Sequence, residues 1–104
     1  MTWFVAFTAS AKRDLKKSKN TPHRARIEEF VACSAIDPFF VPPPFETLSA
    51  DLKGAYSRRI NIQHRFVFSI RTEVSAEEQE TIGLDADDEP FDGIVIVSRC
   101  WGHY

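Results

Sequence analysis

Five side chains could together cut an RNA strand without a metal ion. Such cleavage needs a base that takes the proton from a 2′-hydroxyl group, a guanidinium that stabilises the charge on the phosphorus, and an acid that protonates the leaving 5′-oxygen. Glu46 is a candidate base, and Arg59 and Arg65 could stabilise the charge. His103 and Tyr104 end the chain and could reach the same cleft. Each signal alone is weak, because a lone glutamate is usually a surface charge and a terminal His-Tyr usually frays.

Two strands must position the arginines. Apolar residues alternate with polar ones over residues 56–62 and again over 65–71. A period of two indicates strands with one buried face each. Arg58 falls on the apolar face and is the one misfit in this pattern. It fits there if it sits at a sheet edge, or if its stem lies on apolar surface and its head reaches water.

The length of the loop between these strands decides where the arginines point. A three-residue connection at 62–64 pairs Ile60 with Phe66, and Arg59 and Arg65 then share the open face. A two-residue loop would place Arg59 among the phenylalanines, where an unpaired charge is costly. We therefore predict the odd loop. Exposed arginines on strands also commonly serve only to prevent edge-to-edge pairing.

The N-terminal third begins with a strand and a lysine-rich helix. Residues 3–8 are apolar on both faces, which indicates a buried strand. A helix capped by Thr8 or Ser10 then runs to about Ser18. Its lysines could form a solvated helix face or bind RNA. The basic candidates for binding RNA are Lys12, Lys16, Lys17, Lys19, Arg58 and Arg59.

A second helix and a stiff connector follow. Thr21 is the predicted N-cap, Pro22 occupies the first helical position, and the helix ends near Ile36, before the Asp-Pro pair. Residues 39–44 (FFVPPP) cannot be helical and form an extended connector. The order of one strand, two helices and then strands alone predicts an α+β fold in one domain spanning residues 1–104.

The net charge of -2 hides a strong segregation of charge. Residues 73–92 hold nine acidic residues and no basic one, so 13 basic residues face six acidic ones elsewhere, a net charge of +7. Asymmetry of this kind suggests a nucleic-acid partner. Within the acidic segment, residues 76–82 could form a short helix. Residues 93–101 (GIVIVSRCW) then form a central strand, antiparallel to residues 64–71.

Several classes of protein are excluded by the residue inventory. No apolar run approaches the roughly 18–20 residues that span a bilayer, and the start lacks the charged region of a secretion signal. Cys33 and Cys100 could form one disulfide at most, so we expect reduced thiols in a cytoplasmic protein. The cysteines and histidines show no metal-ligand spacing, and glycines form no phosphate-binding loop, so no metal or cofactor is expected.

Two stretches of the chain carry a resemblance to a known family. Residues 42–46 (PPPFE) and 52–65 (LKGAYSRRINIQHR) resemble the Txe/YoeB toxins of bacterial toxin–antitoxin pairs. The ending CWGHY is similar to the C-terminal signature of that family, and the KRDLKK helix at 12–17 fits its N-terminal region. The resemblance covers residues 1–71 and 93–104. The family usually has a tight turn where this chain carries its acidic segment.

The resemblance implies a RelE-like fold, with two N-terminal helices packed on a four- to five-stranded, mainly antiparallel sheet. It implies an endoribonuclease that occupies the ribosomal A site and cleaves the message there, leaving a 2′,3′-cyclic phosphate and a 5′-hydroxyl. Glu46 then corresponds to the general base, Arg65 to the transition-state clamp and His103 to the general acid. Arg59 and Tyr104 match further active-site positions. The implied partners are an antitoxin of the Phd/YefM type, the ribosome and mRNA, and a homodimer is allowed.

Two other functions fit a RelE-like chain. One is a poison of the gyrase-inhibiting kind, which binds a protein and needs no Glu46, Arg65 and His103 set. The other is a decayed toxin that keeps only its antitoxin site. The acidic segment also has two interpretations: it is a tolerated solvated loop, or it occupies or repels the basic cleft.

Overall fold

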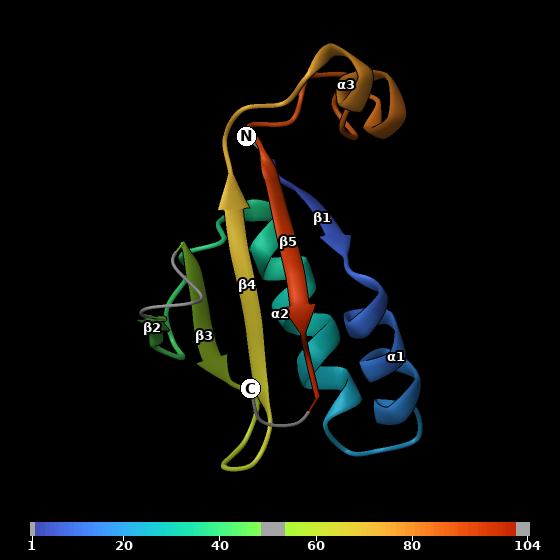
Figure 1. Cartoon of the computed structure of the whole chain (residues 1–104). Helices are drawn as coiled ribbons and strands as arrows, with labels where there is room; N and C mark the ends of the chain where they lie inside the picture. Colours follow the sequence, from blue (N-terminus) through green and yellow to red (C-terminus); the bar gives the residue numbers. More distant parts are fainter. Residues whose placement is uncertain (1, 49–53, 102–104) are drawn as a thin grey trace.

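A five-stranded sheet covered on one face by two helices forms the body of the protein (Figure 1). The computed structural model describes residues 2–48 and 54–101. In chain order the elements are β1 (Phe4–Phe7), α1 (Ala9–Ser18), α2 (Arg24–Ile36), β2 (Phe45–Thr47), β3 (Ala55–Arg59), β4 (Arg65–Arg71), α3 (Ala76–Ile82) and β5 (Ile94–Arg99). The strand order is β1-β5-β4-β3-β2, with β1 parallel to β5 and every other pair antiparallel. The predicted α+β fold is confirmed.

The core lies between the sheet and the helices. Ile27 and Phe30 of α2 are buried against Phe66 and Phe68 of β4, within a cluster that also includes residues of α1 and β5. The alternation along β4 sends these phenylalanines to the helices and the intervening residues to the other face. That other face carries Arg65, so a functional site can form there.

In the N-terminal region the structure selects one of two predicted caps and differs from the sequence prediction in two details. Of the two candidate caps for α1, Thr8 is the one whose hydroxyl accepts the N–H of Ala11, at 3.2 Å. Thr21 is not a cap, because its hydroxyl donates to the carbonyl of Ser18 at 2.6 Å, and α2 begins only at Arg24. Strand β1 is half-buried rather than fully buried, since it forms an edge of the sheet and pairs with β5 alone among the described strands.

The loop between β3 and β4 is longer than predicted but keeps its parity. Arg59 pairs with Arg65, which leaves five residues, 60–64, in the loop and shifts the predicted register by two. The side chain of Asn61 closes this loop by accepting the backbone N–H groups of Gln63 and His64. Five is still an odd number, so both arginines lie on the open face as predicted.

The acidic segment connects β4 to β5 and is anchored to the sheet. The predicted helix is present as α3, which starts with a capping box between Ser75 and Glu78. Arg71 donates to both carboxylate oxygens of Glu78, and Thr2 donates to Asp85 at 2.6 Å. In Figure 1 this segment lies at the opposite end of β4 from the 60–64 loop. It therefore does not occupy the basic cleft.

Strand β5 lies between β1 and β4, as its apolar faces predicted. No helix in the described ranges is long and apolar enough to cross a membrane. Cys33 and Cys100 are not joined in a disulfide.

Candidate active site

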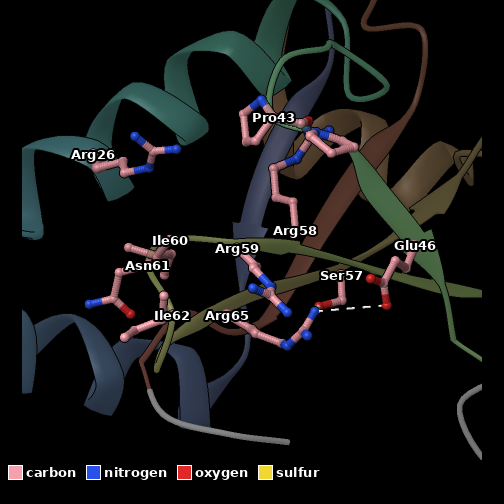
Figure 2. Close-up of a pocket in the computed structure, with 11 residues that line it drawn as sticks. Arg26, Pro43, Glu46, Ser57, Arg58, Arg59, Ile60, Asn61, Ile62 and Arg65 are labelled. Atoms are coloured by element: carbon pink, nitrogen blue, oxygen red, sulfur yellow. Dashed lines mark hydrogen bonds and ion pairs between the residues drawn. The ribbon is translucent and has the colours of Figure 1, made fainter.

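A cleft of about 460 Å³ opens over β3 and the start of β4 (Figure 2). Strand β2, the end of the proline connector and the 60–64 loop form its walls, and Arg26 reaches it from α2. Its lining residues are Arg26, Pro43, Pro44, Glu46, Ser57, Arg58, Arg59, Ile60, Asn61, Ile62 and Arg65. The cleft thus gathers three of the residues predicted from the sequence to do chemistry.

Strand pairing places Glu46, Ser57 and Arg65 beside one another. Glu46 of β2 is opposite Ser57 of β3, and Arg59, two residues farther along β3, is opposite Arg65. One Nη atom of Arg65 lies 3.9 Å from Glu46 Oε2 and donates to the Ser57 hydroxyl at 3.3 Å. Figure 2 shows the carboxylate and the guanidinium facing each other. A base and a cation are therefore held on one surface.

The two members of this pair differ in exposure. The side chain of Glu46 is 67% exposed, whereas that of Arg65 is 21% exposed. A carboxylate open to solvent can reach a bound substrate, and a partly buried guanidinium is held in a more defined position. The arrangement suits proton transfer by Glu46 next to charge stabilisation by Arg65.

Arg26 was not among the predicted site residues, because an arginine on a helix is usually an ordinary surface charge. It does face outward, but over the cleft, and its guanidinium lies 5.2 Å from the centre of the Phe30 ring. Four arginines line the cleft, and Arg26, Arg59 and Arg65 are the three that are not buried; among the described lining residues, Glu46 is the one carboxylate. Such a surface attracts phosphate groups.

Arg58 is not available to bind RNA, contrary to prediction. Its side chain is 1% exposed and lies on the helix side of the sheet. The guanidinium donates to the carbonyl groups of Pro38, Phe40 and Pro43 at 2.7 to 2.9 Å and lies 3.7 Å from the centre of the Phe40 ring. Burial lowers the pKa of Arg58, which nearby Cys33 and Asp37 partly oppose. Arg58 therefore fastens the proline connector under β2.

Solved structures of toxins match the chain over nearly its whole length. A YoeB/ParE toxin from Agrobacterium tumefaciens has a TM-score of 0.73 at 22% sequence identity, covering 97% of this chain and 99% of the other. A YoeB dimer and a YoeB–YefM complex, both from Staphylococcus aureus, have TM-scores of 0.69 and 0.66 at 21% and 22% identity, with both chains fully covered. The chain has the RelE-like fold of the YoeB toxins. No family model matches it, and no curated protein matches its sequence.

Within this RelE-like fold, the lysines of α1 lie outside the cleft. Lys12, Lys16, Lys17 and Lys19 are exposed, and α1 packs against β5 and β1 rather than against the strands that form the cleft.

His103 and Tyr104 lie outside the described residues. No cluster of three metal-ligating side chains occurs among residues 2–48 and 54–101. Burial raises the pKa of the Cys100 thiol to about 12, so this thiol is no nucleophile at neutral pH.

Proposed function

We propose that the chain is the toxin of a toxin–antitoxin pair and cleaves mRNA on the ribosome in the cytoplasm. The observation that carries this proposal is the juxtaposition of Glu46 and Arg65, 3.9 Å apart, in an arginine-lined cleft of a RelE-like fold. A toxin that acted by protein binding alone would need no carboxylate beside a guanidinium. The resemblance of residues 42–46 and 52–65 to the Txe/YoeB family supports the same function.

The proposed reaction needs no water and no metal. Glu46 accepts the proton of a ribose 2′-hydroxyl as the 2′-oxygen attacks the adjacent phosphorus. The guanidinium of Arg65 stabilises the charge that develops on the phosphoryl oxygens, and Arg59 on the same face adds to that field. The bond from phosphorus to the 5′-oxygen breaks, and a general acid, assigned to His103 by resemblance, gives the leaving oxygen its proton. The products are a 2′,3′-cyclic phosphate and a 5′-hydroxyl.

The ribosome and an antitoxin are the proposed partners. Arg26, Arg59 and Arg65 offer phosphate contacts, which supply most of the sequence-independent affinity of a protein for RNA. The matching Staphylococcus aureus structures include a YoeB–YefM complex and a YoeB dimer. An antitoxin of the YefM type and a homodimer are therefore proposed here too.

Expression of the toxin in bacteria, followed by mapping of mRNA 5′ ends, tests the function. The wild-type chain should arrest growth and produce cuts at fixed positions within codons, and Glu46→Ala and His103→Ala should abolish both. Glu80→Ala removes an exposed glutamate of α3 and is the matched control, which should cut like wild type. Growth arrest by the wild type without codon-positioned cuts would refute the ribonuclease and favour a protein-binding poison.

A further inference from the structure

Strand β2, which carries the proposed base Glu46, has little support from the rest of the sheet. It is three residues long and pairs with β3 alone among the described strands. Leu48, just after it, donates its backbone N–H to the carbonyl group of Ala55 at 2.9 Å. Because hydrogen-bonded pairs alternate along an antiparallel ladder, the next such pair is Glu46 with Ser57. Few ladder bonds hold so short a strand, so contacts outside the ladder must contribute to its position.

The guanidinium of Arg58 supplies contacts of this kind to the chain that enters β2. One Nη atom donates to the carbonyl groups of Phe40 and Pro43 at 2.7 and 2.8 Å, and the other donates to that of Pro38 at 2.9 Å. Pro43 is three residues before Glu46 and also lines the cleft. Hydrogen bonds from a charged donor are strong and directional, and this donor is buried. They therefore define the path of the connector up to β2.

Phe45 links the buried guanidinium to the exposed base. It is opposite Arg58 in the ladder of β2 and β3, and the guanidinium carbon lies 5.3 Å from the centre of its ring. The same ring makes edge contacts with the rings of Tyr56 and Phe68, at centre-to-centre distances of 5.8 and 6.5 Å. Neighbouring residues of a strand point to opposite faces. A Phe45 side chain held on the helix side of the sheet therefore places Glu46 on the cleft side.

The side chain of Glu46 restrains itself little. It is mostly exposed, and its carboxylate lies 3.9 Å from an Nη atom of Arg65, which is longer than a hydrogen bond. A side chain that solvent surrounds takes its position from its backbone. We propose that Arg58 is a positioning residue that sets where β2 presents Glu46 to the cleft. This inference rests on the proposed function, in which Glu46 is the general base.

The test compares variants of Arg58 with a control of similar instability. Arg58→Met removes the donors, and Arg58→Lys keeps the charge but lacks the planar fork that reaches three acceptors. Ile27→Ala removes a buried apolar side chain of α2 that is neither a hydrogen-bond partner nor a ring contact of Arg58, and it should also destabilise the protein. Urea denaturation of each full-length variant gives the fraction of folded molecules under the assay conditions.

Two readouts then follow the strand and the reaction separately. The first is the amide hydrogen exchange of Glu46, relative to that of the amides in β4 and β5. The second is cleavage of a defined mRNA on programmed ribosomes, measured per folded molecule as a maximal rate and a half-saturating ribosome concentration.

Both Arg58 variants should speed the relative exchange of the Glu46 amide by about tenfold or more, because β2 can then open locally without breaking the bonds of Arg58. They should lower the maximal rate by about 10²-fold, since a small misplacement of a reacting group costs that much. The half-saturating concentration should stay at the wild-type value, because the other arginines of the cleft remain. Ile27→Ala should leave the relative exchange and the rate per folded molecule unchanged.

Wild-type rates per folded molecule in the Arg58 variants overturn the proposal, as does unchanged relative exchange at Glu46. An equal loss of rate in Ile27→Ala also overturns it, because the loss would then follow from instability alone. If Arg58→Met does not fold, Arg58→Lys supplies both readouts, and if neither folds, Phe40→Leu supplies them by removing the ring that lies 3.7 Å from the guanidinium. If the wild-type protein does not cleave programmed ribosomes, the proposed function fails, and the exchange of the Glu46 amide still decides whether Arg58 fixes β2.

Discussion

Two neighbouring arginines of β3 have opposite surroundings. Arg59 is exposed on the open face, and Arg58 is 1% exposed beneath the proline connector. The period of two in the sequence correctly separates them. It could not show which groups accept the hydrogen bonds of the Arg58 guanidinium, because the three carbonyl acceptors lie in a connector 15 to 20 residues earlier in the chain.

Replacement of Arg58 should destabilise the protein far more than replacement of Arg59. Arg58→Met fills much of the same volume but leaves three carbonyl groups without their donor, which should cost about 3–5 kcal/mol of unfolding free energy. Arg59→Met, at an exposed neighbouring position, should change that free energy by less than about 0.5 kcal/mol. Urea denaturation of both variants measures the difference, and equal stabilities would show that Arg58 has no structural role.

Arg65→Ala should impair catalysis without impairing the fold. Loss of a group that stabilises the developing charge should raise the activation free energy by about 2–4 kcal/mol, which corresponds to a roughly 30- to 10³-fold lower rate of mRNA cleavage on programmed ribosomes. Arg13→Ala should cleave at the wild-type rate. A normal rate for Arg65→Ala would reassign Arg65 to a structural role through Ser57, to which it donates.

At the scale of elements, sequence patterns predicted correctly those helices and strands whose positions are set by interactions between neighbouring residues. The capped helix α1, the end of α2, the short helix α3 and the central place of β5 all follow from signals within a few residues. The predicted start of α2 was wrong because the hydroxyl of Thr21 donates to the carbonyl group of Ser18 and does not cap the helix. The predicted register of β3 and β4 was wrong by two residues, because the side chain of Asn61 closes a loop of five residues instead of three. The contribution of Ser57 to the site had no sequence signal beyond its place on the same face as Arg59.

The anchors of α3 should weaken in acid. A hydrogen bond from Arg71 lowers the pKa of Glu78, and a hydrogen bond from Thr2 lowers the pKa of Asp85. Because folding depresses both pKa values, their stabilising contribution is complete above the unfolded values of about 4 and is lost as the pH falls through the lower folded values. Backbone chemical shifts of α3 should therefore move toward random-coil values below about pH 4, before those of β4 and β5.

Arg71→Ala provides the matched comparison. It removes the partner of Glu78, so the shifts of α3 should already be displaced at neutral pH, and their dependence on acid should decrease. Shifts that stay constant in acid for the wild type would contradict the anchoring role of these two carboxylates.

At the scale of the whole molecule, opposite charges lie at opposite ends. Arg65 begins β4 at the cleft and Arg71 ends it at the acidic segment, six residues and about 20 Å away. The Debye length is about 8 Å at physiological ionic strength and about 30 Å at 0.01 M. The acidic segment should therefore affect RNA bound at the cleft only at low salt.

Deletion of residues 74–91 tests this separation. The deletion removes seven acidic residues and no basic ones, which changes the formal net charge from -2 to +5. We expect the deletion variant to bind RNA more tightly than wild type at 0.01 M salt and with the wild-type affinity near 0.15 M. Its maximal cleavage rate should equal that of wild type at both salt concentrations. A variant of full length with those seven acids changed to amides should behave in the same way. A large change in cleavage at physiological salt would show that the segment acts on the cleft itself.

The central claim is most directly tested by incubating the purified protein with a defined mRNA, alone and bound to ribosomes with an empty A site. We predict cleavage only on the ribosome, at one position in the A-site codon, with a 2′,3′-cyclic phosphate on the upstream fragment and a 5′-hydroxyl on the downstream fragment. Glu46→Ala should bind the same ribosomes but yield neither fragment. Intact mRNA in every lane, or equal cutting by wild type and Glu46→Ala, would contradict the assignment of this cleft as a ribonuclease site.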